Sequence, residues 1–376
     1  MTRRSRSRRC GRQGGCRGHS TPIALGALAT GALLLAAKLV GCREPALSTA
    51  IEGRTHTDAA TEQAPASSSA PATTAASTPS SAPGDDDWPA ALGPRINLPA
   101  ELVAAFTPGN DFAPLPKPGP HDWLSHHQEP GQPFPGFVWS RPNRPSQQRQ
   151  TIYLQPVGWW DTTPPPLKTL EEYARIFFGL EVKRLPVLDP APLKITRRKA
   201  PFGGHTQLKT GDLLETLYQR LPGDAYALFG MTLADLYPDD SWNFVFGEAM
   251  LRQRVGIFSF VRYDPAAYGG TPGPDRSQII LERSLKVMAH EIGHMFGLEH
   301  CTHYHCLLNG NNHLQELDAM PLHLCPVCLR KLQWSARFDP IARYEKLLAF
   351  YRSHNLTGDA EWTARRLEHI RARLSR

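Results

Sequence analysis

The spacing of apolar residues predicts alternating strands and helices in the middle of the chain. Continuous apolar or β-branched runs at 151–157, 225–231 and 255–260 have the length and composition of buried strands. Shorter strands are expected at 182–188 and 243–246. We expect these five segments to form one sheet.

Apolar residues at helical spacing separate the strands. One helix is expected to begin at Thr169, which forms a capping box with Glu172, and to end before Gly179. A second begins near Thr210, and a third runs through 284–289 into a histidine-rich stretch. The order β-α-β-α-β-β-β followed by a helix is typical of a mixed sheet with its helices on one face.

Two more helices are expected near the end of the chain, at 340–354 and 359–374, with Gly358 as the break between them. Leu347 and Tyr351 belong to an apolar stripe on the first of these helices. We therefore expect both helices to pack against the rest of the fold.

The histidine-rich stretch reads HEIGHMFGLEH from residue 290 to residue 300. His290 and His294 are four residues apart, so on a helix their imidazoles share one face and can converge on one metal ion. Gly297 can adopt a positive φ and turn the chain back, which allows His300 to return as a third ligand. Three protein ligands leave the fourth position of a tetrahedral zinc open, as a catalytic site requires.

Glu291 follows the first histidine, where it can act as a general base on water activated by the ion. The alternative is a helix that carries these residues by chance. The added glycine and third histidine, and the apolar residues at helical spacing before the motif, favour a catalytic zinc site.

Four of the seven cysteines follow His300 within 28 residues. Cys325 and Cys328 form a C-x-x-C pair, often one half of a tetrahedral thiolate zinc site, and Cys301 and Cys306 can supply the other half. A second, structural zinc is one interpretation. Two disulfides or four free buried thiols are the alternatives, and export of the protein would favour disulfides.

The stretch from His290 to Cys328 resembles the archaemetzincin family, whose pattern is H-E-x-x-H-x-x-G-x-x-H-C-x4-C-x-M followed by a C-x-x-C pair. Upstream segments that resemble the family lie at 235–238, 242–247 and 256–260. The resemblance covers roughly residues 105–340. One position departs from it, because Leu308 stands where the family carries the methionine of a turn beneath the catalytic metal. Leucine is apolar and close to methionine in volume, so it can preserve the packing there.

The resemblance implies an α+β fold of the metzincin-like zincin type. This fold has a mixed twisted sheet with an active-site helix, then a smaller lower subdomain with a four-cysteine zinc site and C-terminal helices. It also implies a zinc-dependent peptidase that acts on a peptide or protein, with aminopeptidase activity as one form. Two zinc ions per chain are implied, one catalytic and one structural. By analogy, we expect the substrate to pair with a sheet edge near 242–247.

Two other functions fit the same residues. A zinc-stabilised binding module without turnover would keep both metal sites, and Leu308 is the reason to consider it, although the intact Glu291 argues against it. A hydrolase of a non-peptide amide would use the same chemistry. Tyr263 and Tyr268 are candidate hydroxyl donors to a tetrahedral intermediate. His126 and His127 are interpreted as surface residues that bind no metal.

Residues 1–42 have the composition of a targeting segment. Seven arginines precede an apolar run at 22–37, and the sequence LVGC at 39–42 resembles the lipobox of bacterial lipoproteins, with Cys42 as the lipidated residue. We expect an exported protein that a lipid holds at a membrane. An uncleaved anchor and a nucleic-acid-binding arm are the alternatives, although the run is shorter than the roughly 20 apolar residues that a spanning helix needs.

Residues 43–95 are expected to form a disordered linker, because they are rich in Ala, Ser, Thr and Pro. The catalytic domain is expected over 96–376, with its core at 105–340 and a helical tail at 341–376. The net charge is +7, but residues 1–41 hold eight basic residues and no acidic one, so subtracting these eight charges leaves about −1. The basic character therefore belongs to the targeting segment, and we expect a monomer that does not bind nucleic acid.

Overall fold

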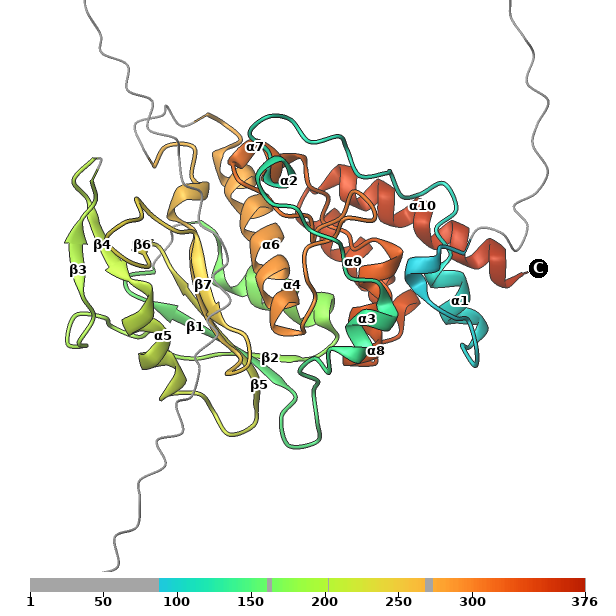
Figure 1. Cartoon of the computed structure of the whole chain (residues 1–376), viewed down its shortest axis with the longest axis horizontal. Coiled ribbons are helices and arrows are strands. Elements are labelled where there is room, and N and C mark those ends of the chain that lie inside the picture. Colours follow the sequence, from blue (N-terminus) through green and yellow to red (C-terminus); the bar gives the residue numbers. More distant parts are fainter. Residues whose placement is uncertain (1–87, 161–163, 202, 268–272, 376) are drawn as a thin grey trace, which may run out of the picture. The chain divides into compact units, whose positions relative to one another are not determined.

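The computed structural model describes residues 88–160, 164–201, 203–267 and 273–375 (Figure 1). Its main sheet has the spatial order β2 (Glu181–Arg184), β1 (Thr151–Val157), β5 (Ala225–Thr232), β8 (Val255–Ser259) and β7 (Gly247–Met250). The first four strands are parallel, and β7 runs antiparallel to β8 at one edge. The sheet is mixed, as expected, and the strands predicted at 151–157, 225–231 and 255–260 are confirmed within one or two residues.

Helices cover both faces of this sheet, so the expectation of helices on one face is wrong (Figure 1). α5 (Thr210–Tyr218) packs on one face through Leu213, Leu214 and Leu217. α4 (Leu167–Phe178) and α6 (Arg276–Met295) pack on the other. Every residue of β1 and β5 is buried. A strand covered on both faces needs apolar residues at successive positions, which explains the continuous runs in the sequence.

The edge strand begins later than the sequence indicates. Residues 243–246 form only an isolated antiparallel bridge, from Val245 to Leu236, and the regular strand β7 starts at Gly247. A second sheet, not expected from the sequence, has the order β3 (Arg197–Lys199), β4 (Thr206–Lys209) and β6 (Asp235–Tyr237). β3 consists only of basic residues, so it carries no apolar alternation that could have identified it.

Two helix boundaries differ from those expected. α4 starts at Leu167 after Pro166, so Thr169 lies inside the helix and is not its N-cap, whereas Gly179 ends the helix with a φ of +64° as expected. Near the C-terminus, the break between the helices falls at Asn355, which has a φ of +56°. Gly358 instead lies in the first turn of the last helix.

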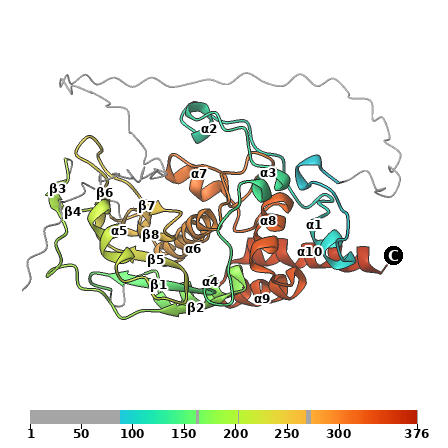
Figure 2. The same ribbon diagram turned by 60° about the horizontal axis from the view of Figure 1, so that its bottom comes forward.

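The C-terminal helices lie on the side of α6 away from the strands (Figure 2). They are α8 (Pro326–Ala336), α9 (Pro340–Ser353) and α10 (Thr357–Leu374). The remaining helical segments are η2 (Ala90–Leu92), α1 (Ala100–Phe106), α2 (Trp123–His126), α3 (Phe134–Trp139), η3 (Val261–Tyr263) and α7 (Leu314–Ala319). The fully buried Arg366 of α10 donates to the carbonyls of Ala105 and Thr107 and pairs with Asp111, which fixes α1 against α10.

The folded part begins before residue 96, the boundary expected from composition. Leu92 is fully buried, and Arg330 of α8 donates to the carbonyl oxygens of Leu92 and Pro94. The predicted targeting segment, including Cys42, lies outside the described residues. None of the helices in the described ranges has the length and apolar character needed to cross a membrane.

Candidate active site

α6 holds two of the motif histidines in a defined tautomer. His290 and His294 are 4% and 5% exposed. Nδ1 of His290 donates to the carbonyl of Leu307 at 2.9 Å, and Nδ1 of His294 donates to that of Leu298 at 2.6 Å. A carbonyl can only accept, so the proton resides on Nδ1 and the lone pair on Nε2. Burial lowers the pKa of both histidines, to about 3 for His294, so both rings are neutral.

The third histidine returns to the same place. The chain turns after α6 at Gly297, which has a φ of +82°, and the ring of His300 lies 5.3 Å and 5.0 Å from those of His290 and His294. One ligand atom from each ring lies within 4.8 Å of the others. Nε2 of His290 and Nε2 of His294 are 3.0 Å apart. Two lone pairs at this separation repel unless a cation lies between them, so the donor set fits a zinc ion.

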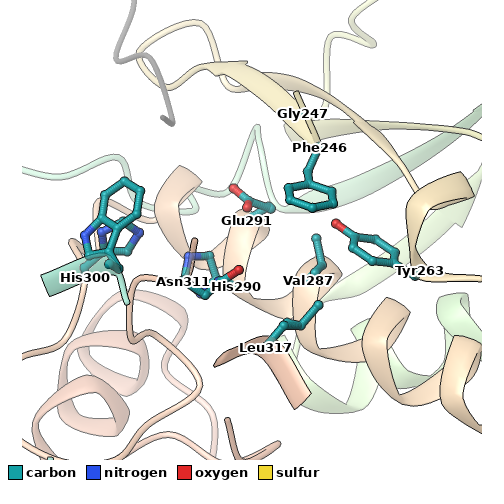
Figure 3. Close-up of a pocket in the computed structure, with 10 residues that line it drawn as sticks. Phe246, Gly247, Tyr263, Val287, His290, Glu291, His300, Asn311 and Leu317 are labelled. Atoms are coloured by element: carbon teal, nitrogen blue, oxygen red, sulfur yellow. The ribbon is translucent and has the colours of Figure 1, made fainter. Parts of the chain in front are cut away.

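Glu291 projects from α6 beside His290, into the hollow seen in Figure 3. Burial raises the pKa of Glu291 to about 8, and its Oε2 makes no hydrogen bond within the described residues. A divalent cation at the histidines would oppose this shift and favour the carboxylate. Glu291 is therefore best suited to act as a general base when a metal ion is bound, because the ion favours its ionised form.

A pocket opens between α6 and the beginning of β7 (Figure 3). Apart from the histidines and Glu291, its lining is mainly apolar and aromatic. The lining residues are Trp123, Phe246, Gly247, Tyr263, Val287, His290, Glu291, His300, Asn311 and Leu317. Phe246 and Tyr263 stack with their centroids 5.5 Å apart. Tyr263, a candidate from the sequence, thus lines the pocket, and Tyr268 lies outside the described residues.

Two residues of the site were not identified from the sequence. Oε1 of Glu129 accepts the Nδ1 proton of His300 at 2.8 Å, and the Trp123 ring meets His300 edge-on at 4.9 Å. Burial raises the pKa of Glu129, but its hydrogen bond with His300 opposes the effect of burial, and the pKa is lowered overall. Glu129 precedes His300 by 171 residues, so no local spacing could have connected them. Of the two histidines interpreted as surface residues, His126 is exposed, but His127 stacks on Trp123 and is half-buried.

Leu308 packs against α6 next to the histidines. Its side chain is fully buried, and its Cδ1 would lie 3.3 Å from a Cβ placed on Gly293. Gly293 directly precedes His294 on α6. The backbone of Leu308 is held as well, because its carbonyl accepts from the N–H of Cys301 at 2.7 Å. Leucine therefore supplies buried apolar packing against α6 at the position where the family pattern has methionine.

The four cysteines converge in one buried cluster. Their Sγ atoms lie within 4.8 Å of one another, and all four are free thiols. Sγ of Cys301 and Sγ of Cys325 are 3.5 Å apart, near the roughly 3.8 Å between sulfur atoms around a tetrahedral zinc. Backbone N–H groups donate to Sγ of Cys306 and of Cys325, as they do to metal-bound thiolates. The cluster fits a tetrahedral metal ion better than a pair of disulfides.

The neighbouring thiols favour loss of the proton from Cys301 but not from Cys306 or Cys325. Their hydrogen bonds hold the pKa of Cys301 well below its usual value, whereas burial raises the pKa of Cys306 and of Cys325. A divalent ion that replaced the thiol protons would stabilise all four cysteines as buried thiolates, which are the form that binds a metal.

A helix that presents two neutral histidines and a glutamate, with a third histidine returned by a glycine turn, defines a zinc metallopeptidase. The profile of Peptidase family M54 matches residues 219–334. Archaemetzincin-2 of Homo sapiens and that of Macaca fascicularis are each 39% identical to the chain over 277 residues, which cover 65% of this chain and 76% of each relative. The chain belongs to the archaemetzincin family.

Among solved structures, the archaemetzincin of Archaeoglobus fulgidus complexed with malonate also aligns with the chain. It is 29% identical, with a TM-score of 0.35, and the alignment covers 48% of this chain and 99% of that one.

Proposed function

We propose that His290, His294 and His300 hold the catalytic zinc and that Glu291 is the general base. The observation that carries this proposal is that Nε2 of His290 and Nε2 of His294 lie 3.0 Å apart. Both rings are in the tautomer that can bind a metal, because each Nδ1 donates its proton to a backbone carbonyl. Zinc in such a site activates water and polarises the scissile carbonyl.

The residues of the chain supply the remaining steps. The carboxylate of Glu291 takes the proton of the attacking water and delivers it to the leaving amine. The apolar lining, including Val287 and Leu317, excludes bulk water around this transfer and strengthens its electrostatics. Tyr263 lies on the pocket wall, where its hydroxyl is a candidate to assist the developing oxyanion.

The substrate is expected to bind as an extended strand along β7. In the described part of the chain β8 is the only strand paired with β7, and Gly247, at the start of β7, lines the pocket. Backbone pairing tolerates many side chains. The apolar wall formed by Phe246, Val287 and Leu317 favours an apolar side chain next to the scissile bond, in an endopeptidase or an aminopeptidase.

A second zinc is proposed in the cluster of Cys301, Cys306, Cys325 and Cys328, where its role is structural. The four buried thiols leave no open coordination position for a substrate. Metal analysis should give about two zinc ions per chain. Replacing Cys328 with alanine should lower this count, and one zinc with no titratable thiols would instead indicate disulfides.

Export is proposed from the sequence of residues 1–42. In a bacterial host, Cys42 should incorporate labelled fatty acid and direct the protein to the membrane fraction. Cys42→Ser should abolish the label, and Cys10→Ser should keep it if cleavage occurs before residue 42. An unlabelled wild-type protein in the soluble fraction would contradict the lipoprotein hypothesis.

Glu291→Gln tests the catalytic proposal. We expect it to keep the zinc content and to lose activity on a peptide library by about 10²–10⁴-fold, the usual contribution of a general base. Glu282→Gln is the control, because it changes the same kind of side chain on the same helix away from the histidines. Equal hydrolysis by the wild type and Glu291→Gln would sink the proposal. Activity on simple amides but on no peptide would instead favour the non-peptide hydrolase.

A further inference from the structure

The three histidines do not receive the same support. His290 and His294 each donate to a neutral backbone carbonyl within the motif region. His300 donates to the carboxylate of Glu129. A carboxylate fixes the tautomer as a carbonyl does, but it also makes the ligand nitrogen more basic. His300, the one histidine of the three that lies outside α6, thus has the only charged acceptor, the carboxylate of Glu129.

The segment that carries Glu129, residues 119–132, is fastened to the metal region at its far end. The side chain of Gln132 is buried, donates to the carbonyl of Gly297 at 3.2 Å and accepts from the N–H of Glu299 at 3.3 Å. Gly131 has a φ of +77°, and a Cβ there would collide with Oγ1 of Thr302. The backbone of this segment therefore lies directly on the turn that carries His300.

The near end of the segment is fastened to α7. The N–H of Trp123 donates to both carboxylate oxygens of Glu316, at 2.9 and 3.1 Å. Asp122 contacts Nε2 of His313, the N-cap residue of α7, at 3.0 Å. With both ends held, Glu129 is kept at a fixed position beside His300 and is not a loop residue that meets it by chance.

We propose that Glu129 is a positioning residue for the third metal ligand, and that residues 119–132 form a strap that completes the metal site. The proposal rests on the proposed function, since it takes His300 as a ligand. The strap lies outside the residues that match the family profile, so this support comes from a part of the chain beyond the motif region.

The test compares Glu129→Ala and Glu129→Gln with Glu171→Ala. Glu171 is a matched control because its carboxylate is similarly exposed and pairs with Arg175 on α4, away from the metal region. Zinc affinity is measured by chelator competition. Cobalt substitution adds a second readout. In protein with cobalt at both sites the near-ultraviolet thiolate bands report the cysteine cluster, and in protein whose cysteine cluster already holds zinc the visible bands report the histidine site alone.

Glu129→Ala is expected to weaken zinc binding at the histidine site by about 10–100-fold and to shift the visible cobalt bands while the thiolate bands stay unchanged. Glu129→Gln keeps an acceptor oxygen and should recover part of the affinity. Zinc affinity in Glu129→Ala equal to that of Glu171→Ala overturns the proposal.

His300→Ala separates this proposal from the one on which it depends. If His300→Ala leaves the zinc affinity unchanged, the proposed ligand set is wrong. If it weakens binding while Glu129→Ala does not, the ligand set stands and only the positioning role fails.

Discussion

Replacing Leu308 with alanine should affect both stability and metal binding. The side chain is fully buried against α6, and its backbone is fixed by the hydrogen bond from Cys301. Leu→Ala changes in cores cost about 2.7–5 kcal/mol, and the cost rises with the cavity that remains. Because the fixed backbone prevents the cavity from closing, we expect a loss of about 3–4 kcal/mol, or roughly 10 °C in Tm.

The measurement is urea unfolding of the zinc-loaded protein together with zinc affinity by chelator competition. Leu217→Ala is the matched control, since Leu217 is equally buried but packs in the core on the other face of the sheet. Both variants should lose stability, and only Leu308→Ala should also bind zinc more weakly. Leu308→Met should cost less than about 1.5 kcal/mol, because it nearly conserves volume.

The reasoning fails if the two alanine variants bind zinc equally well. Leu308 would then be an ordinary core residue, and the packing next to the histidines would have no bearing on the metal.

Three further predictions concern the frame around the site. Asp235 is buried and accepts two hydrogen bonds from Arg262, so Asp235→Ala should cost about 3 kcal/mol at neutral pH in chemical unfolding. Burial raises the pKa of Asp235, but Arg262 and His205 lower it overall. The contribution of Asp235 to the free energy of unfolding is therefore present above the unfolded pKa of about 3.9 and is lost as the pH falls through the folded pKa. The Asp235→Ala variant should lack this acid-dependent loss of stability. Arg366→Met should release α1, which limited proteolysis would detect as new cleavage near residue 107, and an unchanged digestion pattern would contradict it. Gly310→Ala should displace Trp123, because the new Cβ would collide with Cδ1 of that ring, and unchanged zinc affinity and tryptophan emission would refute this.

The sequence identified those parts of the site that depend on local geometry. His290, His294 and Glu291 lie within one helical turn or so, and a single glycine returns His300, so the helical period is enough to bring them together. The four cysteines were also identified, because their spacings match a known ligand pattern. β1 and β5 were found because burial on both faces makes every position apolar.

The parts that escaped prediction depend on contacts between distant segments. Glu129 lies in a proline-rich stretch with little regular structure, and only the folded chain brings it to His300. β7 was misplaced because the aromatic residues Phe244 and Phe246 have the stronger strand propensity, whereas the strand itself reads Gly-Glu-Ala-Met and is held by pairing with β8. Tertiary contacts determined the structure in both cases.

The adjacency of His300 and Cys301 also has a consequence for the order of biosynthesis. Cys301 contacts Cys325, which is added to the growing chain 24 residues later. We infer that a nascent chain carries the complete histidine motif and the strap before the cysteine cluster can fix the turn that follows His300, so the histidine site reaches its full zinc affinity only once Cys325 and Cys328 have left the ribosome. Ribosome-bound chains truncated at residue 324 and extended by a linker that clears the exit tunnel should accordingly bind zinc at the histidines more weakly than full-length chains extended by the same linker, and equal binding would contradict this delay.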